Sequence, residues 1–171
     1  MAESRDTMVS QWANWLGDRM TSARSVPRST VERELRLLID VMTEMVGPMR
    51  REVKLIWYHA CEHFGRVGAA RGLAAGEVVE EMQYLRELLI RNLAPVLAAM
   101  RARQGMATML RLNRVLDKGI AVAVVGYTDA LVATLFAQNG VPSPDNELDG
   151  AEIERQLDAV EQELAATTRK K

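Results

Sequence analysis

Cysteine, histidine and aromatic residues are scarce in this sequence of 171 residues, and their scarcity excludes several kinds of site. Cys61 is the only cysteine, so neither an intrachain disulfide nor a zinc site with several cysteine ligands can form. Two histidines and two phenylalanines offer little to line a haem pocket. We therefore expect no cofactor and no bound metal ion, and a single thiol suits the reducing cytoplasm.

An excess of charge of one sign is also lacking. The chain holds 22 basic and 23 acidic side chains, well interspersed, with a net charge of −1. Binding of nucleic acid or of an anionic membrane through bulk charge is therefore not expected. The most apolar stretch, Gly119 to Phe136, is interrupted by Tyr127, Asp129 and Thr134. It predicts a buried core helix rather than a membrane span, and the polar N-terminal residues argue against a signal peptide.

Helical patterning is abundant. Hydrophobic residues make up 48% of the chain and recur at helical spacing, whereas alternating strand patterns are almost absent. We predict an all-α, single-domain bundle of about six helices, which span about residues 7–24, 29–45, 49–70, 75–103, 106–137 and 149 onward. The expected parts are a helical domain, a linker, and a C-terminal amphipathic helix with a basic tail, in residues 1–140, 141–150 and 151–171.

Glycine and proline mark the predicted helix ends. Gly47–Pro48 ends the second helix, Gly72 ends the third, and Gln104–Gly105 separates the fourth from the fifth. Gly65 and Gly68 lie inside the third segment, where glycine destabilises a helix, so they predict a close helix crossing or a helix end. The fifth segment is the longest and most apolar, and we expect it to be the central helix with two buried sides.

The C-terminal helix carries an apolar stripe at steps of four, three and four residues, formed by Ile153, Leu157, Val160 and Leu164. This spacing is typical of a coiled-coil seam of two heptads. The stripe can pair with a second copy as a dimer seam, or it can dock onto the chain's own domain. Both alternatives stay open, because a helix this short is marginal alone in water.

His59 and His63 are the only histidines, and their spacing of four residues puts both on one helical face. Two imidazoles alone make an incomplete metal site. His63 also precedes Arg66 and Gly68, which is similar to the pattern of histidine phosphotransfer proteins, where an accessible imidazole lies beside a cation. Phosphotransfer through an exposed His63 is therefore an alternative hypothesis. The sequence has no phosphate loop, nucleophile elbow or catalytic carboxylate pair, so we do not expect an enzyme.

Three short patterns carry a resemblance to a known family. They are His63-Phe-Gly-Arg66, Arg71-Gly72 and Glu81-Met-Gln-Tyr-Leu85-Arg86, followed by Leu112-Asn113-Arg114 with Asp117 and Tyr127 further on. Over about residues 8–140 the chain resembles the N-terminal domain of RsbT co-antagonist proteins of the RsbRD type, which also precedes sensor histidine kinases. The resemblance implies a bacterial, globin-like sensor domain without haem that works as a dimer in stress signalling. No STAS or kinase domain follows here, so we expect the output to pass through a separate protein partner.

These observations favour a cytoplasmic sensory or adaptor module that acts as a homodimer and contacts a regulator or kinase. Within it we expect His63, Arg66, Glu81 and Arg86 to form a regulatory polar cluster between the third and fourth helices. Two rival hypotheses are a phosphotransfer protein that uses His63, and a structural assembly subunit that associates through its last helix.

Overall fold

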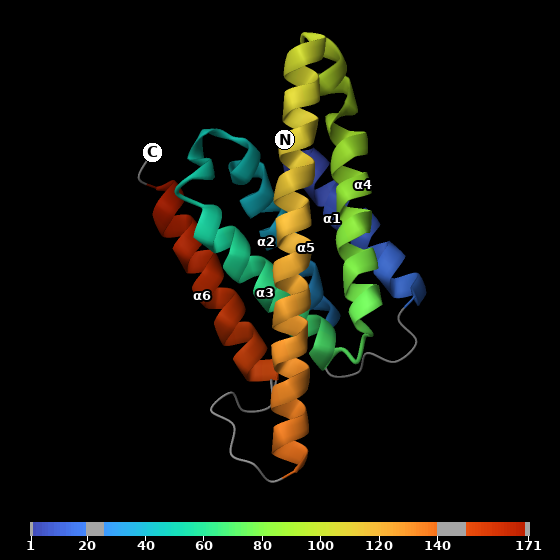
Figure 1. The fold of residues 1–171 in the computed structure, drawn as a ribbon, viewed down its shortest axis with the longest axis vertical. Coiled ribbons are helices and arrows are strands. Elements are labelled where there is room, and N and C mark those ends of the chain that lie inside the picture. Colours follow the sequence, from blue (N-terminus) through green and yellow to red (C-terminus); the bar gives the residue numbers. More distant parts are fainter. Residues whose placement is uncertain (1, 20–25, 140–149, 170–171) are drawn as a thin grey trace.

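The computed structural model describes residues 2–19, 26–139 and 150–169, which form six α-helices and no β-strand (Figure 1). The helices are α1 (Ala2–Arg19), α2 (Arg28–Val46), α3 (Lys54–Ala70), α4 (Ala75–Ala99), α5 (Ala102–Gln138) and α6 (Gly150–Thr168), with a short 3₁₀ turn, η1 (Pro48–Arg50), between α2 and α3. The predicted all-α, single-domain bundle is confirmed.

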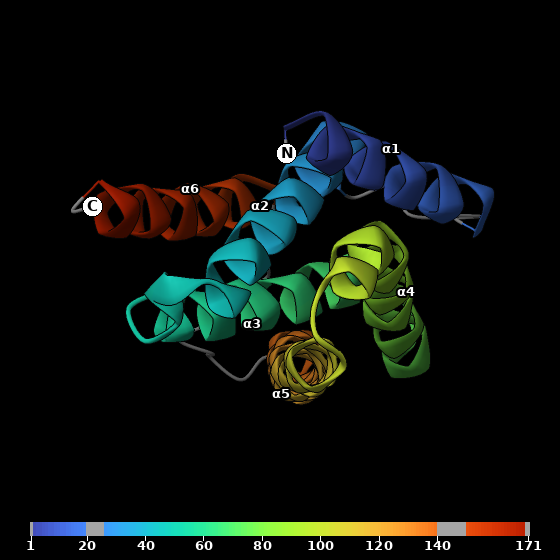
Figure 2. The same cartoon turned by 90° about the horizontal axis from the view of Figure 1, so that it is seen from above.

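Helices α2 and α3 form the middle of the bundle, because α2 packs against α1, α3, α5 and α6, and α3 packs against α2, α4, α5 and α6. Seen from above, α3 lies between α5 on one side and α2 and α6 on the other (Figure 2). Helices α4 and α1 lie toward the C-terminal end of α3. Trp57 and Phe64 of α3 are fully buried, and Phe64 meets Trp12 of α1 with ring centroids 5.9 Å apart. The prediction that the fifth segment is central was therefore wrong.

Helix α5 stands at the edge of the bundle and buries one side only. The side chains expected to give it two buried sides are divided, since Leu112 and Leu116 are buried whereas Leu110, Leu131 and Leu135 are exposed. A sequence pattern shows that a helix is apolar all round, but it does not show whether other helices are available to cover both sides.

Glycine lets α3 and α5 approach until their backbones touch. A Cβ atom on Gly65 of α3 would lie 1.8 Å from the carbonyl oxygen of Ala123, and one on Gly126 of α5 would lie 2.2 Å from that of Glu62. One on Gly119 would lie 2.5 Å from the Trp57 ring. The close crossing predicted from Gly65 is therefore confirmed, and its partner is α5.

The corner between α3 and α4 depends on Gly72, which has a φ of 75°. The amide of Leu73 donates to the carbonyl of Gly68 (3.1 Å), and the amide of Gly72 donates to that of Ala69 (2.9 Å). This pair of hydrogen bonds is the Schellman motif, in which glycine readily adopts the left-handed conformation that ends a helix. The helix end predicted at Gly72 is confirmed.

Other boundaries differ from the predictions. The break between α4 and α5 falls at the extended residues Met100 and Arg101 rather than at Gln104–Gly105. Gly105 lies inside α5, where a Cβ atom would press on the carbonyl oxygen of Leu97 at 3.3 Å, so this glycine serves a close approach. The first helix begins at Ala2 rather than at residue 7. Positions 20–24, Asp149 and most of the predicted linker lie outside the described residues.

Candidate functional site

His63 lies inside the bundle, where it joins three helices. Its Nδ1 atom is 2.7 Å from Oε1 of Glu34 in α2, and its Nε2 atom is 3.0 Å from the carbonyl oxygen of Ile153 in α6. His63 and Glu34 are both buried, with 4% and 1% of their surface exposed. The expectation of an exposed His63 was wrong, because α6 covers the face of α3 that carries it. Phosphotransfer would need an accessible imidazole, and here both ring nitrogens are engaged.

The charge of this buried pair follows from its geometry. Burial alone would lower the pKa of His63, but the hydrogen bond to Glu34, the negative charge of Glu34 and the carbonyl of Ile153 together leave that pKa raised. A protonated ring can donate to both acceptors at once, which a neutral ring cannot. Oε2 of Glu34 is buried and has no hydrogen-bond partner among the described residues, so His63 is the main compensation for its charge.

A second buried ion pair closes the corner between α3 and α4. Arg71 donates to both carboxylate oxygens of Glu81, at 2.9 and 2.8 Å, and both side chains are buried. Burial raises the pKa of Glu81, and the hydrogen bond and charge of Arg71 offset only part of that effect. A bidentate pair of this kind restricts the geometry of the corner between α3 and α4.

The four residues expected to form one polar cluster therefore have four different partners. His63 binds Glu34 and Glu81 binds Arg71, as described above. Arg66 binds Glu62 one turn away on α3 (2.9 Å), and Arg86 of α4 binds Asp117 of α5. Sequence reasoning missed Glu34 and Asp117, which lie 29 and 31 positions from their partners and gave no local signal.

Helix α6 docks onto its own chain, which is one of the two alternatives left open for its apolar stripe. Ile153, Leu157 and Val160 are buried in the common core, and Leu164 is partly buried against it. The stripe packs on α2 and α3. In this arrangement it is not free to serve as a dimer seam or as an assembly contact.

Polar contacts on both sides of the stripe fix the register of α6. Arg33 of α2 pairs with Asp158 and Glu161 of α6, and His59 of α3 lies 3.1 Å from Glu163. His59 and His63 therefore bind different partners on α6 and α2. Among the described residues, no three His, Cys, Asp or Glu side chains are grouped so that they could hold a metal ion.

The second half of α5 has an inverted arrangement of small and large residues. Its small residues face the core, where Gly119, Ala123, Gly126 and Ala130 are buried. Its large apolar residues face outward, and Val125, Leu131, Val132, Leu135 and Phe136 are between 41% and 56% exposed. We call these five side chains the α5 face. In a monomer the large side chains of a helix normally face the core.

No described helix covers the α5 face. Figure 2 looks along α5 and shows α3 and α4 on one side of it and no helix on the other, and Figure 1 shows its lower end extending past the bundle. Exposed apolar side chains continue at the other end of the helix pair, where α4 meets α5, with Val96, Met100 and Met106. An exposed apolar surface of this extent marks a site of interaction.

Helix α5 is long and apolar enough to cross a membrane by length and composition, and only 11% of its most apolar window is buried. The prediction that this stretch forms a buried core helix was therefore wrong. No family model, curated protein or solved structure matches the chain.

Proposed function

We propose that this chain is a non-catalytic regulatory module, a cytoplasmic sensory or adaptor domain, which forms a homodimer through the α5 face. The main support for this proposal is the orientation of α5, which turns its glycine and alanine residues inward and its valine, leucine and phenylalanine residues outward. This orientation lets α3 approach closely on one side and leaves a broad apolar surface on the other.

A second copy of the chain suits this surface better than a charged partner. Asp129 is the only charged residue between Lys118 and Gln138, so the surface offers little to opposite charges. Positions 121, 125, 128, 132 and 135 are all exposed and repeat at steps of four and three, which is the spacing of a helix that pairs with another. Two copies related by a two-fold axis would each present the same stripe.

The expected dimer is reversible. Covering a half-exposed Val, Leu or Phe side chain at the interface stabilises the dimer by about 1 kcal/mol. The five side chains of the α5 face in each of two copies would then contribute on the order of 10 kcal/mol. Association costs about 4–15 kcal/mol, so the gain and the cost are similar in size. Such a balance permits a signal to shift the equilibrium.

A signal would act through the helices that hold α5 in place. Helix α3 contacts both α5 and α6, and the buried His63–Glu34 pair joins α3 to α2 and α6. A partner that displaced α6 would therefore disturb the helix on which α5 rests. The resemblance to the RsbRD type supports this proposal, since it implies a dimeric, globin-like input domain in stress signalling that passes its state to a regulator or kinase.

The experiment measures molar mass by size-exclusion chromatography with light scattering. We expect Val132→Glu and Leu135→Glu to shift the chain from dimer to monomer, because each places a charge in the paired surface. Leu55→Glu is the matched control, since Leu55 of α3 is 62% exposed and lies outside the α5 face. The proposal fails if the unmodified chain is a monomer throughout, or if Leu55→Glu dissociates the dimer as strongly as Val132→Glu does. Retention of the chain in detergent micelles or vesicles alone would favour a membrane contact instead.

A further inference from the structure

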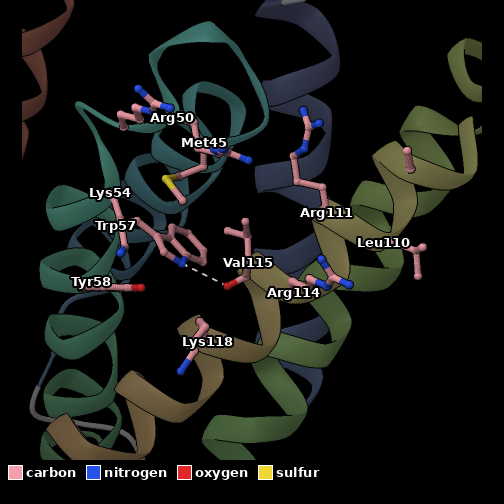
Figure 3. Close-up of a pocket in the computed structure, with 12 residues that line it drawn as sticks. Met45, Arg50, Lys54, Trp57, Tyr58, Leu110, Arg111, Arg114, Val115 and Lys118 are labelled. Atoms are coloured by element: carbon pink, nitrogen blue, oxygen red, sulfur yellow. Dashed lines mark hydrogen bonds between the residues drawn. The ribbon is translucent and has the colours of Figure 1, made fainter. Parts of the chain in front are cut away.

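Six basic side chains surround one open pocket of about 670 Å³ between η1, the start of α3 and the first half of α5 (Figure 3). They are Arg50, Arg51, Lys54, Arg111, Arg114 and Lys118. None of the described residues that line this pocket is acidic. A chain with a net charge of −1 therefore places six basic residues around one pocket. We call this the basic pocket.

The helical spacing of α5 produces one wall of the basic pocket. Arg111, Arg114 and Lys118 lie at positions i, i+3 and i+7, so they share a face. Like charges at this spacing destabilise a helix unless something neutralises them. Asp117 is the only acidic residue in the first half of α5, and it pairs with Arg86 of α4 instead.

The six cations have no counterion within the described part of the chain. None of them forms an ion pair there, in contrast to Arg33, Arg71 and Arg86. Lys54 instead lies over the ring of Tyr58, whose centroid is 5.7 Å from Nζ. Their charges are therefore left for an anion from outside.

A hydrogen bond and a close packing contact join the two walls of the basic pocket. Trp57 is fully buried, and its Nε1 donates to the carbonyl oxygen of Val115 on the opposite wall at 3.2 Å (Figure 3). Gly119 lets α5 pack directly on the Trp57 ring. Walls that are already joined in the free chain cost a ligand less binding energy for ordering the backbone.

We propose that the basic pocket binds a small molecule that carries several phosphate groups. Arginine binds phosphate oxygens through two parallel hydrogen bonds, and four of the six cations are arginines. The volume lies in the range of small-ligand pockets, which is about 300–1,000 Å³. The half-buried ring of Tyr58 on the α3 wall offers a surface for an apolar part of the ligand.

This binding site does not depend on the proposed dimer. The basic pocket uses cations from residues 50–54 and 111–118, whereas the α5 face uses residues 125–136. Loss of phosphate binding would leave the molar mass of the chain unchanged, and a monomeric chain could still bind phosphate. The two experiments can therefore fail separately.

The test is isothermal titration calorimetry of the full chain with inorganic tripolyphosphate at about 0.15 M salt, where the Debye length is about 8 Å. We expect saturable binding that weakens about tenfold or more in the double variant Arg111→Gln/Arg114→Gln. The matched control is Arg101→Gln/Arg103→Gln, because both residues are exposed on or next to α5 and neither lines the basic pocket. Its affinity should stay within about twofold of the unmodified chain.

Three outcomes would overturn the proposal. One is the absence of binding by the unmodified chain. Another is equal weakening in both double variants, which would show diffuse attraction by surface charge. The third comes from a competing single-stranded oligonucleotide, which would show that a nucleic-acid backbone is the ligand if it bound much more tightly than tripolyphosphate and lost that affinity in Arg111→Gln/Arg114→Gln.

Discussion

Replacing Gly126 by alanine adds one methyl group where α5 touches α3. The new Cβ atom would lie 2.2 Å from the carbonyl oxygen of Glu62, 2.9 Å from its carbonyl carbon and 3.0 Å from its Cα atom. All three are backbone atoms of α3, so no side chain can rotate away. The two helices would have to separate by about 1 Å to restore van der Waals contact.

The cost follows from that separation. Inserting a methyl group into a packed core costs about 1–3 kcal/mol when side chains can adjust, and more when they cannot. We take about 3–5 kcal/mol for a clash between backbones. Alanine returns about 1 kcal/mol through its better helix propensity. The expected loss in the free energy of unfolding is therefore about 2–4 kcal/mol, or about 5–15 °C in Tm for a chain of this length.

Thermal and urea denaturation followed by circular dichroism at 222 nm measure this loss, at one protein concentration so that association does not intervene. Gly76→Ala is the matched control, because a Cβ atom on Gly76 of α4 meets nothing within 4 Å. That variant should gain up to about 1 kcal/mol. If Gly126→Ala were as stable as Gly76→Ala, α5 would not turn its small residues toward α3.

Three further predictions concern buried groups. The pKa of His63 is raised in the folded state, so His63 stabilises the fold fully below its unfolded pKa of about 6.5. This stabilisation is lost as pH rises through the raised pKa. In urea melts from pH 6 to 9 the free energy of unfolding should therefore decline, and His63→Gln should lack this decline. Glu81→Ala should lower the free energy of unfolding by about 3–5 kcal/mol in the same assay, because it leaves the buried charge of Arg71 unpaired. Glu87→Ala removes one partner of an exposed pair and should cost less than about 1 kcal/mol. Equal losses would contradict the burial of the Arg71–Glu81 pair. Burial raises the pKa of the Cys61 thiol well above its ordinary value, so a thiol reagent should label Cys61 only after denaturation, and rapid labelling of the folded chain would contradict its position.

The fold was predictable where the signal is local. Apolar residues at helical spacing predicted the helices, Gly47–Pro48 and Gly72 predicted two helix ends, and Gly65 predicted the close crossing. The break between α4 and α5 was predicted at the wrong place, because Gly105 was interpreted as a helix breaker. In the structure Gly105 lies inside α5 and makes room for the backbone of α4. A single sequence does not distinguish a glycine that ends a helix from one that makes room.

The site was less predictable because its residues meet across long separations. The apolar stripe of α6 was identified correctly, but its partner was left open, and so α6 was not expected to cover His63. The six cations of the basic pocket come from two segments about sixty positions apart, and the acidic residues interspersed with them in the sequence, Glu52 and Asp117, do not line the pocket. Evenly mixed charge along a chain does not exclude a charged pocket in the folded structure.

The most direct test of the account is photo-crosslinking through the α5 face. With Val132→p-benzoylphenylalanine, irradiation should give a covalent dimer of about twice the 19.1 kDa chain mass, and mass spectrometry should place the crosslink in residues 119–138 of the second copy. Crosslinks confined to one chain, or joined to a distant surface of the second copy, would show that the large apolar side chains of α5 do not form the dimer contact.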